Sequence, residues 1–164
     1  MPTEIERKYL VTGDAWRNSI TDQTPMRQGY FETAPGATVR VRIEGERAVL
    51  TIKGPTVGIS RAEYEYEIPL DDARQMLDIF CEGRQVEKVR HYVSHAQKTW
   101  EIDVFEGANK GLVLAEVELE RADEEVDVPE WIGEEVSHDS RYRNACLAVQ
   151  PVGSKSVGNK PAGD

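Results

Sequence analysis

Apolar and polar residues alternate with a period of two over much of the chain, as they do in β-strands that have one buried face. The N-terminal stretch TEIERKYLV shows the pattern, because Glu4, Glu6 and Lys8 share one face and the opposite face is mostly apolar. Taken alone, such a strand is expected to turn its charged face to water and its apolar face to the core. Eight segments alternate in this way: Glu4–Val11, Gln28–Thr33, Thr38–Glu44, Ala48–Lys53, Ser60–Ile68, Val86–Val93, Lys98–Phe105 and Leu112–Arg121.

Turn-like sequences separate several of these segments. They contain glycine and, in two cases, proline: APGA at 34–37, EGER at 44–47, KGPTVG at 53–58 and EGANKG at 106–111. Short connections between alternating segments favour an antiparallel arrangement of neighbouring strands. The sequence therefore predicts a mostly antiparallel, meander-like β body.

Helices are predicted only outside the alternating segments. Residues 69–81, PLDDARQMLDIFC, begin with a proline and two aspartates and continue with apolar residues at helical spacing. Residues 137–149 predict a second helix, with Ser137 or Asp139 as its N-terminal cap. Residues 13–19 predict a short helical turn.

Length and composition indicate one soluble domain. The chain has 164 residues, of which 39% are hydrophobic and 30% charged, enough to build one core. We expect this domain to occupy residues 1–150 and the tail 151–164, rich in Gly, Pro, Ser and Lys, to be disordered. The formal net charge of −10 argues against a general nucleic-acid-binding protein, which is usually basic. It does not exclude an anionic small molecule, because local charge can oppose the net charge.

The sequence favours a cytoplasmic location without a membrane partner. The N-terminus lacks the basic and apolar regions of a signal peptide, and no apolar run reaches the length of a membrane span. The two cysteines, Cys81 and Cys146, lie far apart in the sequence, and we expect both to be reduced thiols that pack in the interior.

Ionisable residues recur on one face of nearly every predicted strand, and their signs group by strand. A surface that only confers solubility usually mixes the two signs. The basic positions are Lys8, Arg40, Arg42, Lys53, Lys88 and Arg90. The acidic positions are Glu4, Glu6, Glu63, Glu65, Glu67, Glu101, Asp103, Glu116, Glu118 and Glu120.

If the strands close into a barrel with the charged faces inside, these faces would form a binding site for charged ligands. An eight-stranded barrel has room for its side chains or for one small ligand. Since unpaired buried charge costs several kcal/mol per ion, such an interior must stay wet and pair its charges. Arginine and lysine would bind a polyphosphate, and clustered carboxylates would bind Mg²⁺ or Mn²⁺.

The ordered set of charged strands resembles the CYTH superfamily, the triphosphate tunnel metalloenzymes. EIERKYLV is similar to the N-terminal E-x-E-x-K signature of that family. The later segments follow in the order of the family: VRVR, TIK, EYEYEI, KVRH, WEIDVFEG, LAEVELE and VSHDSRYRNACLA. The resemblance covers residues 3 to about 149 and is greatest to the short bacterial members.

The resemblance implies an eight-stranded antiparallel closed β-barrel that forms a tunnel, flanked by a few helices, and a requirement for Mg²⁺ or Mn²⁺. The implied metal ligands are Glu4, Glu6 and Glu118, with Glu63, Glu65, Asp103 and Glu116 as additional candidates. The implied ligands of the triphosphate are Lys8, Arg40, Arg42, Lys53, Lys88 and Arg90. The implied catalytic residues are Lys8, Glu116 and Arg90. The C-terminal helix around Arg141 and Tyr142 is expected to close one end.

The activity that this resemblance favours is hydrolysis of inorganic triphosphate (tripolyphosphate) to pyrophosphate and phosphate, with water as nucleophile. Six predicted tunnel cations, and no recognisable pocket for a base or a thiazole ring, motivate that choice. Thiamine triphosphatase, nucleoside triphosphatase, adenylate cyclase and a non-catalytic polyphosphate- or nucleotide-binding module stay open as alternatives. The carboxylate set argues against a pure binding module, and the oligomeric state, including a homodimer, also stays open.

Overall fold

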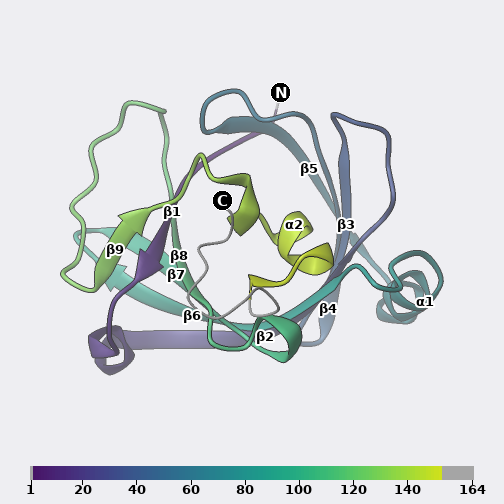
Figure 1. The fold of residues 1–164 in the computed structure, drawn as a ribbon, viewed down its shortest axis with the longest axis horizontal. Helices are drawn as coiled ribbons and strands as arrows, with labels where there is room; N and C mark the ends of the chain where they lie inside the picture. Colours follow the sequence, from purple (N-terminus) through teal and green to yellow (C-terminus); the bar gives the residue numbers. More distant parts are fainter. Residues whose placement is uncertain (1, 153–164) are drawn as a thin grey trace.

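A closed antiparallel barrel of eight β-strands forms the body of the protein in the computed structural model, which describes residues 2–152 (Figure 1). The strands are β1 (Thr3–Val11), β2 (Ile20–Tyr30), β3 (Thr38–Glu44), β4 (Arg47–Lys53), β5 (Ser60–Ile68), β6 (Gln85–His95), β7 (Lys98–Phe105) and β8 (Val113–Glu118), with a ninth strand, β9 (Ile132–Glu135), outside the barrel. The helical elements are α1 (Leu70–Phe80), α2 (Asn144–Val149) and the 3₁₀ turns η1 (Ala15–Ser19), η2 (Gly107–Asn109) and η3 (Ser140–Tyr142). Among these described residues, every helix is too short or too polar to be a candidate for crossing a membrane.

Strand β1 closes the barrel. One edge of β1 pairs with β8, from Glu6↔Glu118 to Leu10↔Leu114. Its other edge pairs first with β5, from Thr3↔Ala62 to Ile5↔Ser60, and then with β9. Because β1 bridges β5 and β8, the eight-stranded sheet is left without a free edge.

The meander-like arrangement that the sequence predicts consists of two meanders. Strands β2 to β5 follow one another in the sheet, and so do β6 to β8. The connection through α1 leads from β5 to β6, which pairs with β2 instead of β5. The closed eight-stranded antiparallel barrel itself was predicted correctly.

Several element boundaries differ from the prediction. Strand β2 covers Ile20–Tyr30 instead of the predicted 28–33, and it pairs with β6 along most of this length. The pattern missed its first half because those residues are mainly polar and include Pro25. Strand β8 ends at Glu118, and β9 was not predicted at all, since four residues are too short for a clear pattern. The second helix is split into η3 and α2. The predicted disordered tail lies mostly outside the described residues.

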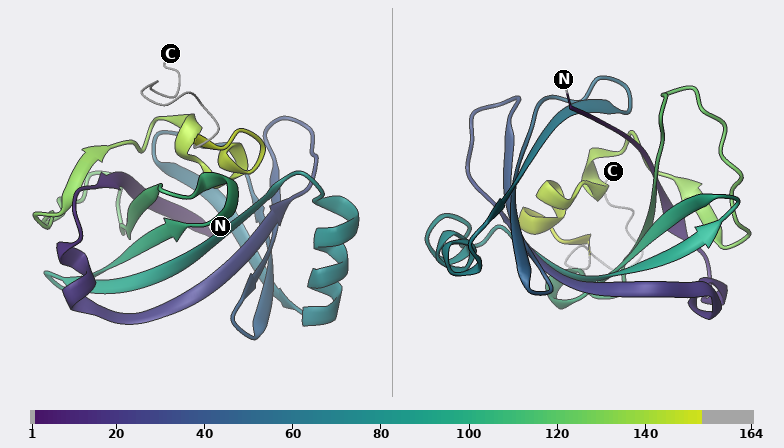
Figure 2. Two further views of the ribbon diagram at one scale, coloured as in Figure 1. Left: turned by 60° about the horizontal axis from the view of Figure 1, so that its bottom comes forward. Right: turned by 180° about the vertical axis from the view of Figure 1, so that it is seen from behind.

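The apolar outer faces of the strands need cover, because the charged faces point inward. Helix α1 lies against the outside of the barrel and packs Ala73 and Leu77 on Val41 and Ala48 (Figure 2). Gly29 allows this approach, since a Cβ atom there would lie 2.7 Å from Leu77 Cδ2. Around the other side, Trp16 of η1 and Trp100 of β7 belong to a second apolar cluster.

A third apolar cluster lies at one end of the barrel, where α2 packs. Leu147 and Ala148 of α2 contact a cluster that includes Phe105, Leu114 and Val86 of the barrel strands. Phe105 follows Asp103 by two residues, and Leu114 precedes Glu116 by two, so these apolar residues share the inner face with the charged ones. Helix α2 therefore acts as an apolar stopper at this end (Figure 2).

Candidate active site in the barrel interior

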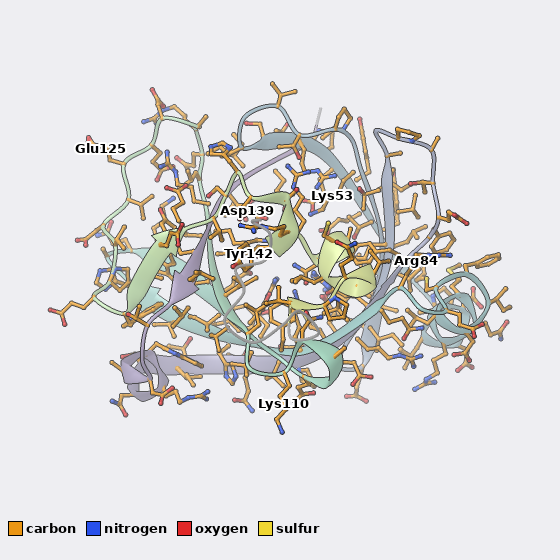
Figure 3. The ribbon with its side chains drawn as sticks, viewed as in Figure 1. Lys53, Arg84, Lys110, Glu125, Asp139 and Tyr142 are labelled. Carbon is orange, nitrogen blue, oxygen red and sulfur yellow. The ribbon has the colours of Figure 1, made fainter. Side chains whose placement is uncertain are left out.

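The barrel encloses a water-accessible cavity of about 560 Å³ whose walls are mainly charged. Nine basic and nine acidic side chains line it. Lys53, which lines the cavity, is seen within the outline of the barrel, whereas Lys110 and Glu125 extend from its outside (Figure 3). The expectation that the charged strand faces point inward is thus confirmed.

The structure brings the predicted site residues together. The lining includes Lys8, Arg40, Arg42, Lys53, Lys88 and Arg90 among the bases and Glu4, Glu6, Glu63, Glu65, Glu116 and Glu118 among the acids. Asp103 is almost completely buried in the adjoining wall, where it contacts two of these bases. The positions of these residues are consistent with the predicted roles, and the roles themselves stay predictions.

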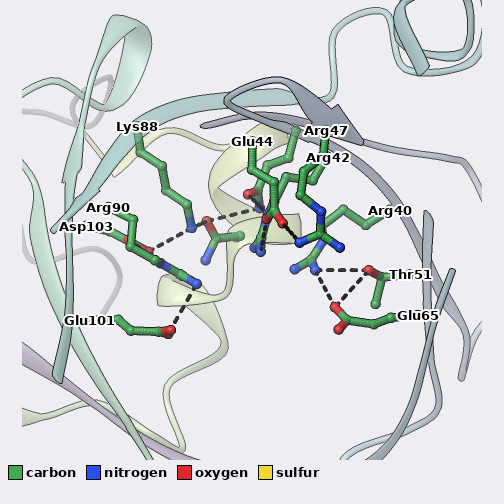
Figure 4. Close-up of polar contacts among 12 residues, drawn as sticks. Arg40, Arg42, Glu44, Arg47, Thr51, Glu65, Lys88, Arg90, Glu101 and Asp103 are labelled. Atoms are coloured by element: carbon green, nitrogen blue, oxygen red, sulfur yellow. Dashed lines mark hydrogen bonds and ion pairs between the residues drawn. The ribbon is translucent and has the colours of Figure 1, made fainter. Parts of the chain in front are cut away.

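Asp103 holds the two cations of strand β6. Lys88 Nζ lies 2.7 Å from Asp103 Oδ2, while Arg90 Nε and Nη2 donate to the two carboxylate oxygens at 2.8 and 2.9 Å (Figure 4). Although burial opposes ionisation, Arg90 and Lys88 hold the pKa of Asp103 well below its usual range. Burial lowers the pKa of Lys88 to about 7. This tightly bonded trio fixes two positive groups at the cavity wall.

Glu116 joins Arg90 to Lys8 of strand β1. Glu116 lies 3.3 Å from both cations, through Oε2 to Lys8 Nζ and through Oε1 to Arg90 Nη2. Lys8 Nζ also donates to the carbonyl of Tyr142, at 3.0 Å. Despite burial, Lys8 and Arg90 lower the pKa of Glu116 to about 2. Glu116 is therefore a permanent anion that positions two cations, and a poor proton acceptor near neutral pH.

The facing wall carries two arginines of strand β3. Arg40 donates to Thr51 Oγ1 at 3.0 Å and lies 3.5 Å from Glu65 (Figure 4). Arg42 Nε donates to the buried side chain of Gln28, at 2.9 Å. Burial, together with the charges of Arg40 and Arg90, lowers the pKa of Arg42 to about 10. Cations on both walls thus face one small cavity.

Carboxylates crowd the β1 side of the cavity. Glu6 is the register partner of Glu118, and burial, together with the charges of Glu116 and Glu4, raises the pKa of Glu6 well above its usual range. Both oxygens of Glu4 accept hydrogen bonds from Lys53, at 2.9 and 3.1 Å. Within residues 2–152, no three acidic, histidine or cysteine side chains already lie close enough together to form a metal-binding group, so these carboxylates would have to move toward a bound cation.

Some lining residues were not predicted as site residues. Arg61 lies on the same face of β5 as Glu63, so strand alternation could have identified it. Arg143 and Asn144 come from the η3–α2 junction, where the sequence offers no periodic signal. Arg141, expected near the closed end, pairs with Asp139 and does not line the cavity.

Comparison with known proteins identifies close relatives. The CYTH domain model matches residues 2–145. The chain is 44% identical over 151 residues to an inorganic triphosphatase of Acetivibrio thermocellus, covering 92% of this chain and 96% of that protein. It is 39% identical to an inorganic triphosphatase of Nitrosomonas europaea, and the match covers 90% of this chain and 97% of that protein. A crystal structure of an inorganic triphosphatase superposes with a TM-score of 0.67 at 35% identity, covering 91% of this chain and 96% of that one.

Proposed function

The chain belongs to the CYTH domain family, and from that premise we propose that it hydrolyses inorganic triphosphate to pyrophosphate and phosphate. The observation that carries the proposal is the ring of cations around the cavity: Lys8, Arg40, Arg42, Lys53, Lys88 and Arg90. Two relatives that match over at least nine-tenths of both chains are named inorganic triphosphatase, which supports this substrate.

The electrostatics suit phosphoryl transfer. Catalysis of that reaction depends mostly on positioning and on neutralising charge in the transition state. Arginine can bind two phosphate oxygens at once, and lysine contributes a compact charge. In our proposal Arg40 and Arg42 bind the phosphate chain from one wall, and Lys88 and Arg90 bind it from the other.

We assign the catalytic residues from the contacts of β1, β6 and β8. Lys8 and Arg90 contact the phosphoryl group that is transferred, and Glu116 keeps both of them in place. Because the pKa of Glu116 is low, we assign it this positioning role rather than that of general base. Water is the nucleophile.

We propose that Glu4, Glu6 and Glu118 bind Mg²⁺ or Mn²⁺, with Glu63, Glu65 and Glu116 as further candidates. The donor chemistry fits, because carboxylate oxygens are the ligands that these hard cations prefer. Burial, and after it the negative charges of Glu116 and Glu4, raise the pKa of Glu6, so a bound cation would favour its ionised form. A bound metal would supply a Lewis acid for the phosphoryl oxygens. Metal binding at Glu4 requires its ion pair with Lys53 to open.

Asp103 was also predicted as a candidate metal ligand, and its contacts favour another role. Both of its oxygens already accept hydrogen bonds from Lys88 and Arg90. Displacing Lys88 would leave a buried cation without its acidic partner, and displacing Arg90 would break two hydrogen bonds to Asp103. We therefore propose that Asp103 positions the two cations and does not bind the metal.

A phosphate-release assay tests the proposal. Inorganic triphosphate, ATP and thiamine triphosphate are compared with Mg²⁺, with Mn²⁺ and with a chelator, and the ATP reaction is also examined for cyclic AMP. We expect metal-dependent phosphate release that is fastest from inorganic triphosphate. Production of cyclic AMP, faster release from another substrate, or no reaction with any of them would contradict the proposal.

A further inference from the structure

Two of the arginines that line the cavity have no carboxylate partner among residues 2–152. The other lining bases are paired with acids: Lys8 with Glu116, Arg40 with Glu65, Arg42 and Arg47 with Glu44, Lys53 with Glu4 and Glu63, Lys88 with Asp103, and Arg90 with Asp103, Glu101 and Glu116. Among residues 2–152, Arg61 and Arg143 line the same cavity without an acid at ion-pairing distance. Their positive charge is therefore available to a ligand.

Arg61 is held in place by neutral groups. Its Nε donates to the carbonyl of Gly54 at 3.0 Å, and its Nη2 donates to Thr38 Oγ1 at 3.2 Å. These bonds orient the guanidinium group without neutralising it, and they leave Nη1 for another acceptor. An arginine that is already oriented loses less conformational freedom when it binds a ligand.

Arg143 also lines the cavity, from the junction of η3 and α2. It lies between η3 and α2, is exposed to solvent, and is flanked by the lining residues Ser140 and Asn144. Both arginines line the one cavity, and beside burial, which is the main cause, the charge of Arg143 contributes to lowering the pKa of Arg61. Two like charges brought together in this way favour an anion between them.

Arg61 lies beside the Glu4–Lys53 ion pair of the cavity wall. Arg61 is the register partner of Glu4, and two residues further along β5, Glu63 lies 3.6 Å from Lys53. A phosphate chain bound to Lys53 would thus have one end near Arg61. Inorganic triphosphate has a terminal phosphate at both ends, each carrying almost two negative charges near neutral pH. In a nucleoside triphosphate one end is esterified, so it carries one negative charge and a bulky nucleoside.

We propose that Arg61 and Arg143 bind the terminal phosphate of inorganic triphosphate that is not transferred, which is the esterified end of a nucleoside triphosphate, and thereby set a preference for inorganic triphosphate. This inference rests on the proposed function and adds two specificity-determining residues to it. Both act on substrate binding and neither takes part in the bond-breaking step, so their effect is expected in KM and not in kcat.

The test compares Arg61→Gln and Arg143→Gln with the wild-type protein. KM and kcat are measured for inorganic triphosphate, and ATP is measured as a substrate or as a competing inhibitor. We expect each variant to raise KM for inorganic triphosphate about tenfold, as the loss of one charge-assisted contact would, with kcat changed less than about twofold. The KM or inhibition constant of ATP should change less than about threefold. Lysine in place of arginine at either position should retain most of the affinity for inorganic triphosphate.

Arg121→Gln serves as the matched control, since Arg121 is an exposed residue paired with Asp123 away from the cavity. Melting temperatures establish that all variants are folded. If the wild type is active and the variants bind both substrates as tightly as before, the specificity role is wrong and the proposed function stands. The same holds if the variants lose affinity for both substrates equally. A wild type that does not hydrolyse inorganic triphosphate would overturn both.

Discussion

The inner face of the barrel changes from charged to apolar within one step of strand alternation. On β7 the step is from Asp103 to Phe105, and on β6 it is from Lys88 to Val86. The charged region surrounds a wet cavity, whereas the apolar region packs against α2. The same backbone geometry thus supports a binding site and a stopper.

The contrast shows how a barrel interior can tolerate so much charge. In the charged region, stability depends on each ion having partners, because a buried ion without one costs several kcal/mol. In the apolar region, stability depends on the burial of apolar side-chain surface away from water. The apolar stopper also limits how much water reaches Lys88 and Asp103 from this end, and electrostatic interactions strengthen as water is excluded.

Asp103→Asn should have the largest effect on stability, because it removes the anion that Lys88 and Arg90 share. We expect a loss of about 3–5 kcal/mol in the free energy of unfolding, measured by denaturant titration at pH 7. The pKa of Asp103 is depressed in the folded state, so its contribution is complete above about pH 4 and is lost as the pH falls. Wild-type stability at neutral pH in this variant would contradict the role of Asp103.

Leu147→Ala tests the apolar region, since Leu147 of α2 is completely buried there. The substitution should cost about 2–5 kcal/mol in the free energy of unfolding. Turnover of the folded variant should change only a few-fold, because the charged region keeps all its groups. Val149→Ala, at an exposed position of the same helix, is the control. A collapse of kcat without loss of stability would show that the stopper takes part in the reaction.

Glu6→Gln should separate activity from stability in the charged region. We expect metal-dependent turnover to fall about a hundredfold or more, as when an essential electrostatic group is removed. The pKa of Glu6 is raised in the folded state, so ionising it costs stability, and that cost grows as the pH rises through the folded-state value. In a chelator at pH 8 the variant should therefore melt no lower than wild type. Glu120→Gln, on an exposed residue, is the control, and near-normal turnover would refute the metal assignment.

Gln28→Leu tests the hydrogen bonds that join Arg42 of the charged region to residues beside the apolar region. Of the four substitutions, it should change stability and activity least. Gln28 accepts from Arg42 and donates to Tyr30 Oη at 2.8 Å and to Asn144 at 3.4 Å. Removing it leaves polar partners unsatisfied, at about 1–3 kcal/mol of stability. We expect KM for inorganic triphosphate to rise a few-fold, because Arg42 loses its orientation. Unchanged KM and stability would show that Arg42 is positioned without Gln28.

Strand alternation in the sequence determined most of the inner face. It identified the charged positions of β1, β3, β4, β6, β7 and β8, because the side-chain period of a strand is independent of its neighbours. The closed barrel followed from the grouping of these charges and from the family resemblance. The two-meander order did not follow from the pattern, since the pairing of β6 with β2 is a non-local choice.

The tertiary structure alone decided which charges neutralise one another. The sequence gives no means of seeing that Glu116 lies between Lys8 and Arg90, because the three residues come from different strands. It likewise gives no sign that Arg143 reaches the cavity from the η3–α2 junction or that Arg61 lacks an acidic partner within residues 2–152. Periodicity fixes the direction of a side chain along its own strand, whereas ion pairs depend on the register and tilt of strands that are distant in the chain.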